Sequence, residues 1–134
     1  LIAYFEQVDE STILVFFGDH QPAIEEELVE ELLGAPLDQL SMEQLQKRYT
    51  VPFFIWANYD IAEATYDQIS LNYLSTLVLQ TAGLEMTPYH QYLAQLQQQV
   101  PMINTLGYTD KTGQYHEFIE ETAEQQWIEE YKTV

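Results

Sequence analysis

The sequence predicts a mixed α/β fold, part of a three-layer α/β/α sheet with two mainly parallel strands, flanking helices, and a C-terminal β-hairpin and helix. Two apolar runs, at residues 13–17 and 53–57, show no alternation of polar and apolar positions. Such runs are typical of strands that are buried on both faces of a parallel sheet. Helical spacing of apolar residues between and after these runs predicts the covering helices.

Three short helices are expected around the two strands, at residues 2–8, 24–33 and 41–48. Gly34 follows the second helix, and glycine favours the left-handed backbone that ends many helices. Ser41 begins the third helix, with a glutamine three positions later that completes a capping box. The glutamates of the second helix predict a solvated face beside an apolar stripe. That stripe consists of Ile24, Leu28 and Leu32.

The second half of the chain predicts two further helices, a hairpin and a last helix. The helices are expected at residues 70–82 and 87–99, the second of them begun by Thr87 and a following proline. Residues 107–116 place two polar and aromatic arms around a glycine-containing turn, which indicates an antiparallel hairpin. A helix at residues 123–132 closes the chain.

The composition excludes several classes of function. The chain has 134 residues, with 22 acidic side chains against 4 basic ones and a formal net charge of -18. This charge repels nucleic acid and anionic lipid, so we expect neither as a partner. The absence of cysteine rules out disulfides, thiolate nucleophiles and cysteine-ligated zinc. The sequence has no apolar run of the roughly 20 residues that cross a bilayer, and no signal peptide is expected.

An acid and a histidine stand side by side at the end of the first predicted strand. Asp19 and His20 directly follow Gly18, and open α/β sheets bind their ligands at the carboxyl ends of strands. A carboxylate and an imidazole are good ligands for zinc or manganese, although two ligands alone do not make a stable site. From these residues alone, the alternative is that His20 is an ordinary loop histidine, hydrogen-bonded to Asp19 or to a backbone carbonyl, with no metal. His90 and His116 are expected on the surface.

Polar residues also follow the second predicted strand. If the two strands are parallel, Asn58 and Tyr59 lie at the same edge of the sheet as His20. We therefore expect Gln21, Asn58 and Tyr59 to line the substrate side of a site there. An ordinary turn is the alternative interpretation of the second group.

Four segments, in order along the chain, resemble a known family. They read TILVFFGDHQPAI, VPFFIWANYDI, ISLNYLSTLVLQTAGLEMTPY and INTLGYTDKTGQYHE. Together they resemble the carboxyl-terminal part of bacterial sulfatase-like proteins of the lipoteichoic acid synthase group, within the alkaline phosphatase superfamily. The resemblance runs from about Leu1 to His116. It implies that residues 1–106 are the C-terminal portion of a sulfatase-like catalytic domain, followed by a hairpin and helix at residues 107–134.

The resemblance implies a metal site at the acid–histidine pair. Asp19 and His20 correspond to two ligands of a catalytic divalent metal, with manganese expected first and zinc, magnesium or calcium as alternatives. The nucleophilic threonine of the family is expected upstream, because no threonine here stands in that motif. Gln21 begins the run Gln-Pro-Ala-Ile, where lipoteichoic acid synthases place a small hydroxyl residue, so the resemblance leaves the substrate open.

The implied function belongs to the intact parent protein. The family suggests a phosphoglycerol transferase, phosphodiesterase or sulfatase that acts on an anionic phosphate or sulfate ester. It also implies the extracellular face of the bacterial membrane, with the parent anchored by upstream transmembrane helices. We expect the isolated chain to be inactive and to bind metal weakly.

Two further expectations concern binding. A noncatalytic acidic domain that binds a protein or glycan through some of its 10 tyrosines is the alternative to an enzyme. Strands that are apolar on both faces also predict that the fragment self-associates, as a dimer joined through the strand region.

Overall fold

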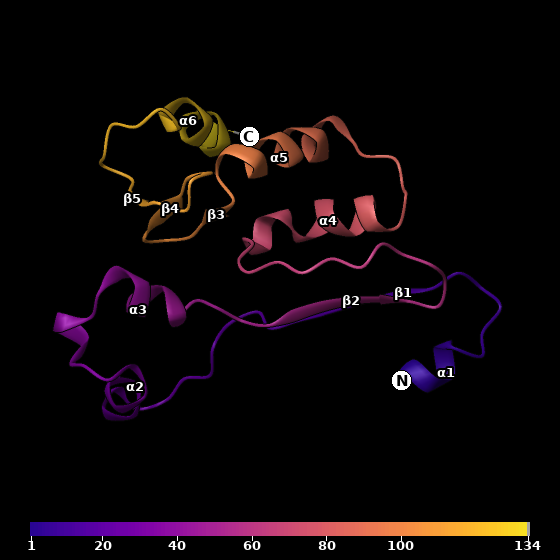
Figure 1. The fold of residues 1–134 in the computed structure, drawn as a ribbon, viewed down its shortest axis with the longest axis horizontal. Helices are drawn as coiled ribbons and strands as arrows, with labels where there is room; N and C mark the ends of the chain where they lie inside the picture. The colour runs from indigo at the N-terminus through magenta and orange to yellow at the C-terminus, as the bar shows by residue number, and fades with distance from the viewer. Residues whose placement is uncertain (134) are drawn as a thin grey trace. The chain divides into compact units, whose positions relative to one another are not determined.

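The computed structural model describes residues 1–133 and confirms the mixed α/β class (Figure 1). The chain forms two compact units, one of residues 14–56 and one of residues 1–13 with the chain from residue 57 onward. The helices are α1 (Ile2–Phe5), α2 (Glu26–Leu33), α3 (Met42–Lys47), α4 (Leu74–Thr81), α5 (Pro88–Gln99) and α6 (Gln125–Thr133), with 3-10 turns η1 (Leu37–Gln39) and η2 (Leu71–Tyr73). The strands are β1 (Ile13–Phe17), β2 (Phe53–Ala57), β3 (Met102–Ile103), β4 (Gly107–Thr109) and β5 (Tyr115–Glu117).

The strands β1 and β2 pair with each other, but they run antiparallel rather than mainly parallel. The backbone N–H of Asn58 donates to the carbonyl of Thr12, and that of Gly18 donates to the carbonyl of Pro52, each at 3.1 Å. The start of one strand therefore lies beside the end of the other. The expected burial on both faces is also absent, since β1 and β2 form a two-stranded sheet in which Phe16, Phe17 and Phe54 are exposed. An apolar run carries no information about the direction of a strand, which explains why the predicted parallel pairing was wrong.

Gly18 is required by close packing at the end of β1. A Cβ atom placed on Gly18 would lie 2.9 Å from the Cβ of Val51, in the segment that leads into β2. Any side chain here would push the two backbones apart, so glycine is the residue that lets the pair close. The rings of Phe16 and Phe54 stack across the two strands with centroids 5.4 Å apart, and both side chains remain exposed.

Local signals predicted the helix ends of this unit well. Ser41 caps α3 in the expected capping box, and Gly34 ends α2 with a positive φ of 77°. The predicted apolar stripe of α2 is not buried. Leu28 and Leu32 are exposed, and Val29 is the buried residue of that helix. The stripe predicted from spacing is therefore not the face that α2 buries.

The larger unit contains the hydrophobic core. The turn η2, the helices α5 and α6 and the strand β4 contribute residues to it. Thr87 caps α5 with proline at the first helical turn, as predicted. The hydroxyl of Tyr73 donates to the carbonyl of Val100 at 2.8 Å, so this buried phenol is satisfied. The core residues are Tyr73, Leu93, Leu96, Val100, Tyr108 and Ile128.

The predicted hairpin is confirmed and gains a third strand. The strands pair antiparallel in the order β3-β4-β5, with Tyr108 opposite His116. A Cβ atom on Gly107 would lie 2.1 Å from the carbonyl oxygen of His116, so glycine permits the close approach of β4 and β5. Gly113 takes a positive φ of 86° in the connecting turn. In the part of the chain described, no helix is both long and apolar enough to cross a bilayer.

Candidate functional site

The predicted metal ligands, Asp19 and His20, lie in the bend that follows β1 and are exposed, with side-chain exposures of 79% and 76%. One carboxylate oxygen of Asp19, Oδ1, accepts the backbone N–H of His20 at 2.9 Å. The other oxygen, Oδ2, lies 3.5 Å from Nε2 of His20. The carboxylate and the imidazole therefore face each other within one short turn.

The hydrogen bond of His20 determines which of its ring nitrogens can bind a cation. Nδ1 lies 2.8 Å from the carbonyl oxygen of Gln21. A carbonyl oxygen only accepts, so Nδ1 carries the proton and the neutral ring presents its lone pair at Nε2. A backbone carbonyl that holds the second ring nitrogen in this way is the usual support of a metal-ligating histidine.

The two available donor atoms have the spacing of a ligand pair. Two ligands that each lie about 2.1 Å from a tetrahedral metal are separated by about 3.4 Å, and Asp19 Oδ2 lies 3.5 Å from His20 Nε2. An oxygen and a nitrogen donor together suit manganese or zinc. Among the side chains that the structure describes, however, no group of three or more His, Cys, Asp or Glu could hold a metal ion. The pair fits two positions of a coordination sphere.

Gln21, the next predicted site residue, is tied to the segment before β2. Its side-chain amide donates to the carbonyl of Thr50, while its own carbonyl accepts from His20. Gln21 thus links the turn that carries the acid–histidine pair to the neighbouring segment. In this structure it positions His20.

Asn58 and Tyr59 do not lie where parallel strands would have placed them. Because β1 and β2 are antiparallel, the end of β2 lies beside the start of β1 and not beside the turn that carries His20. The side-chain oxygen of Asn58 accepts the backbone N–H of Thr12 at 2.8 Å. The geometric reason for placing Asn58 and Tyr59 at the site therefore fails.

The amide of Asn58 instead organises the segment between α1 and β1. Its Nδ2 donates to the carbonyls of Phe5, Val8 and Glu10 at distances of 3.0–3.2 Å. Together with the bond to Thr12, these contacts use both ends of the amide. Asn58 is thus a structural residue.

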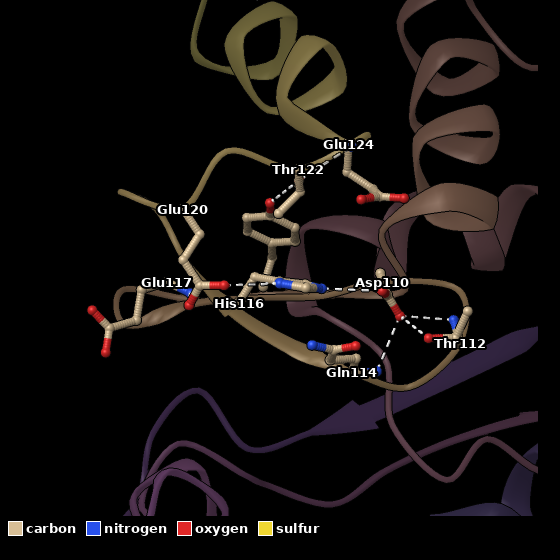
Figure 2. Close-up of polar contacts among 9 residues, drawn as sticks. Asp110, Thr112, Gln114, His116, Glu117, Glu120, Thr122 and Glu124 are labelled. Carbon is tan, nitrogen blue, oxygen red and sulfur yellow. Dashed lines mark hydrogen bonds and ion pairs between the residues drawn. The ribbon is translucent and has the colours of Figure 1, made fainter.

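A second histidine, His116, lies between two carboxylates on the three-stranded sheet (Figure 2). Its Nε2 is 3.0 Å from Oδ2 of Asp110, and its Nδ1 is 3.1 Å from Oε2 of Glu120. The side chain of His116 is only 10% exposed. The expectation of a surface histidine was wrong for His116, because the pairing of β4 with β5 covers it with the ring of Tyr108, at a centroid distance of 5.4 Å.

Asp110 is held by the turn that joins β4 to β5. Its Oδ1 accepts the backbone N–H of Thr112, the hydroxyl of Thr112 and the backbone N–H of Gln114, at 2.7–3.0 Å. These bonds, the Thr112 hydroxyl first among them, together with the bond from His116, hold the pKa of Asp110 well below its usual range against the effect of burial. Asp110 is therefore ionised at neutral pH.

The two carboxylates favour the charged form of His116. Hydrogen bonds to Asp110 and then to Glu120 raise the pKa of His116 above its ordinary value of 6.5, although burial alone would lower it. The backbone N–H of Glu117 and the imidazole lower the pKa of Glu120. Two ionised carboxylates only accept, so both ring nitrogens must donate. The arrangement holds an imidazolium and leaves it no lone pair with which to bind a metal.

The sequence carries two local signals for this cluster. An aspartate followed by threonine two positions later is typical of a side-chain-stabilised turn, and Glu120 stands four positions after His116. Neither pattern alone shows that the groups meet, since the contact depends on the hairpin register.

The comparisons with known proteins concern the first part of the chain. The family model described as Sulfatase matches residues 1–84. No curated protein and no solved structure matches the chain. The matched range contains β1, β2 and the pair Asp19 and His20, whereas the cluster around His116 lies outside it.

Proposed function

Because the chain belongs to the sulfatase family, we propose that Asp19 and His20 are two ligands of the divalent metal of a sulfatase-type enzyme, of which this chain is the C-terminal part. The observation that carries this proposal is the distance of 3.5 Å between Oδ2 of Asp19 and Nε2 of His20. The pair directly follows a strand within the range that the family model matches.

The residues of this chain would hold and orient the ion. Asp19 supplies an anionic oxygen, and His20 supplies a neutral nitrogen whose orientation the carbonyl of Gln21 fixes. When bound, a divalent metal lowers the pKa of a hydroxyl nucleophile and stabilises the charge that develops on the ester. We place that nucleophile outside these 134 residues, because no threonine in this chain stands in the nucleophile motif of the family.

We propose manganese as the first candidate for the metal. A donor set of one carboxylate and one imidazole suits manganese or zinc, whereas magnesium and calcium prefer oxygen ligands. The resemblance to the lipoteichoic acid synthase group also favours manganese. Zinc is the second candidate on the same chemical ground.

The substrate of the intact protein would be an anionic phosphate or sulfate ester. The family supports a sulfuric ester hydrolase, and the four segments that resemble the lipoteichoic acid synthase group support phosphoglycerol transfer at the extracellular face of the bacterial membrane. Both reactions require charge to be neutralised at a tetrahedral centre, which is the role we give to the metal that Asp19 and His20 hold.

Calorimetric titration of Mn²⁺ into the 134-residue chain tests the proposed ligands. We expect weak binding, because two ligands are fewer than a stable site requires. That binding should weaken at least about tenfold in His20→Ala, the loss expected when a contact worth about 1.4 kcal/mol is removed. The matched control is His90→Ala, which removes a half-exposed histidine of the other unit and should leave the affinity unchanged.

Two results would overturn this account. Equal affinities for the unaltered chain and for His20→Ala would show that His20 is not a ligand. Submicromolar affinity that depends on His20 would show that the chain contains a complete site.

A further inference from the structure

Side-chain contacts among Asp110, His116 and Glu120 join the three-stranded sheet to the segment between β5 and α6. Asp110 belongs to the turn after β4, His116 lies on β5, and Glu120 lies in the segment that leads from β5 to α6. In Figure 2, the imidazole lies between the two carboxylates. The contact between His116 and Glu120 therefore fixes how the chain leaves the sheet.

The two carboxylates are held with unequal strength. Asp110 is 12% exposed in its side chain, and its other oxygen accepts three further hydrogen bonds. Glu120 is 48% exposed in its side chain, and its other oxygen accepts a single backbone N–H, from Glu117. When the imidazole loses a proton, its bond to Glu120 breaks more easily than its bond to Asp110, because water can solvate the more exposed carboxylate of Glu120.

A second contact joins the segment between β5 and α6 to the sheet. The hydroxyls of Tyr108 and Thr122 hydrogen-bond to each other. Just beyond this contact begins α6, whose Ile128 is buried in the core at 2% exposure. Release of the segment would loosen the attachment of α6.

We propose that Asp110, His116 and Glu120 form a pH-operated clasp that holds residues 118–124 against the sheet while His116 is charged and releases them when it becomes neutral. Loss of the Nδ1 proton to solvent leaves a lone pair facing the ionised oxygen of Glu120 at 3.1 Å, which is repulsive. The proton on Nε2 and its bond to Asp110 remain.

The groups that face the imidazole support this direction. Of the acidic side chains drawn in Figure 2, Asp110 and Glu120 contact the ring, and Glu117 and Glu124 contribute backbone N–H donors to Glu120 and Thr122. The ring of Tyr108 is a neutral neighbour, tilted against the imidazole. The two anions favour the charged imidazole and outweigh the opposing effect of burial.

The sign of the effect follows from proton linkage. The closed segment binds the His116 proton more tightly than the open one, because opening removes a carboxylate. The clasp is therefore at full strength below the pKa that His116 has in the open state, where its bond to Asp110 remains. It weakens as the pH rises from that value toward the pKa of the closed state, and it weakens no further above it. Within that window the ratio of closed to open falls by up to about tenfold per pH unit.

Amide hydrogen exchange on the full chain tests the clasp. Protection of residues 118–124, corrected for the intrinsic rise of exchange with pH, should fall by up to about tenfold per pH unit between the open-state and closed-state pKa values of His116. This slope should vanish in Glu120→Gln. It should persist in Glu121→Gln, the matched control, which removes the same charge from an exposed neighbour. Equal slopes in the unaltered chain and in Glu120→Gln, or no slope in either, would overturn the proposal.

The ring nitrogen signals of His116 provide a measurement that needs no variant. At neutral pH both ring nitrogens should carry protons, and the loss of one should coincide with the loss of protection at residues 118–124. A neutral His116 ring at pH 7, or a titration that leaves this protection unchanged, would overturn the proposal even if Glu120→Gln does not fold.

Discussion

Two histidines in this chain contact carboxylates, but their surroundings differ and suit them to different roles. His20 and Asp19 are neighbours in the sequence and exposed, and Nδ1 of His20 bonds to the neutral carbonyl oxygen of Gln21. His116 is buried, its carboxylates come from other segments, and both of its ring nitrogens are engaged. We propose that Asp19 and His20 bind a cation. Both ring nitrogens of His116 already bond to carboxylates that hold the fold together.

The difference explains why we assign the proposed metal to His20 and not to His116. A carbonyl oxygen on one ring nitrogen leaves the other available, and that is the case at His20. A carboxylate on each nitrogen favours a fixed imidazolium, and that is the case at His116. Burial alone would have identified His116 as the site, yet the number of uncommitted donor atoms favours His20.

The largest expected effect concerns the backbone that presents His116. Gly107→Ala should destabilise the fold by about 3 kcal/mol, the upper range for forcing extra volume into a packed site, because the added carbon would lie 2.1 Å from a backbone oxygen. Gly18→Ala at the end of β1 should destabilise the fold less, since its added carbon would lie 2.9 Å from a side-chain atom of Val51 and not from a backbone atom. Urea unfolding of both variants checks the order, and a larger loss for Gly18→Ala would contradict it.

The next effect compares the two histidines directly. His116→Ala should lower the free energy of unfolding by about 2 kcal/mol, because it leaves Asp110 poorly exposed and without its cationic partner. His20→Ala should change it by less than about 0.5 kcal/mol, as is usual for surface positions. Thermal unfolding followed by circular dichroism provides the comparison. Equal losses would show that the two groups do not differ in structural role.

A third substitution tests the role of Asn58. Asn58→Ala should destabilise the chain by about 1.5 kcal/mol, because it removes four hydrogen bonds that are partly exposed. Tyr59→Phe is the neighbouring control and should be nearly neutral. If Asn58→Ala left stability unchanged, the amide would not hold the segment before β1 as described.

The smallest effect is the dependence of global stability on pH. Asp110 has a lowered pKa, so its contribution is present above the ordinary value of 3.8 and is lost as the pH falls toward the folded-state pKa. His116 has a raised pKa, so its contribution is full below 6.5 and is lost as the pH rises. Urea unfolding should therefore show this region's contribution at its greatest between these two values. Asp110→Asn should flatten the acid side, and an unchanged acid side would contradict the assignment.

Much of the local structure could be predicted from the sequence, because its signals are local. Ser41, Thr87 and Gly34 mark helix ends through bonds or backbone angles within one turn, and all three predictions are confirmed. The position of Asp19 and His20 directly after β1 was predictable for the same reason.

The remaining features depend on contacts between distant segments. The direction of β1 relative to β2 is set by which ends meet, and neither apolar run contains that information. The burial of His116 depends on its register opposite Tyr108 and on a carboxylate from the turn. The neighbours of Asn58 depend on the same strand direction, so the antiparallel pairing places it beside Thr12 and not beside His20.

The most direct test of the comparison follows the ring signals of all three histidines in one spectrum while Mn²⁺ is added at physiological salt. Mn²⁺ broadens the signals of nuclei close to it, so each histidine reports on its own surroundings. Our account predicts that the signals of His20 broaden first, while those of His116 and His90 stay sharp over the same range of concentration. Broadening of His116 at or before the concentration that affects His20 would contradict the assignment of metal binding to Asp19 and His20.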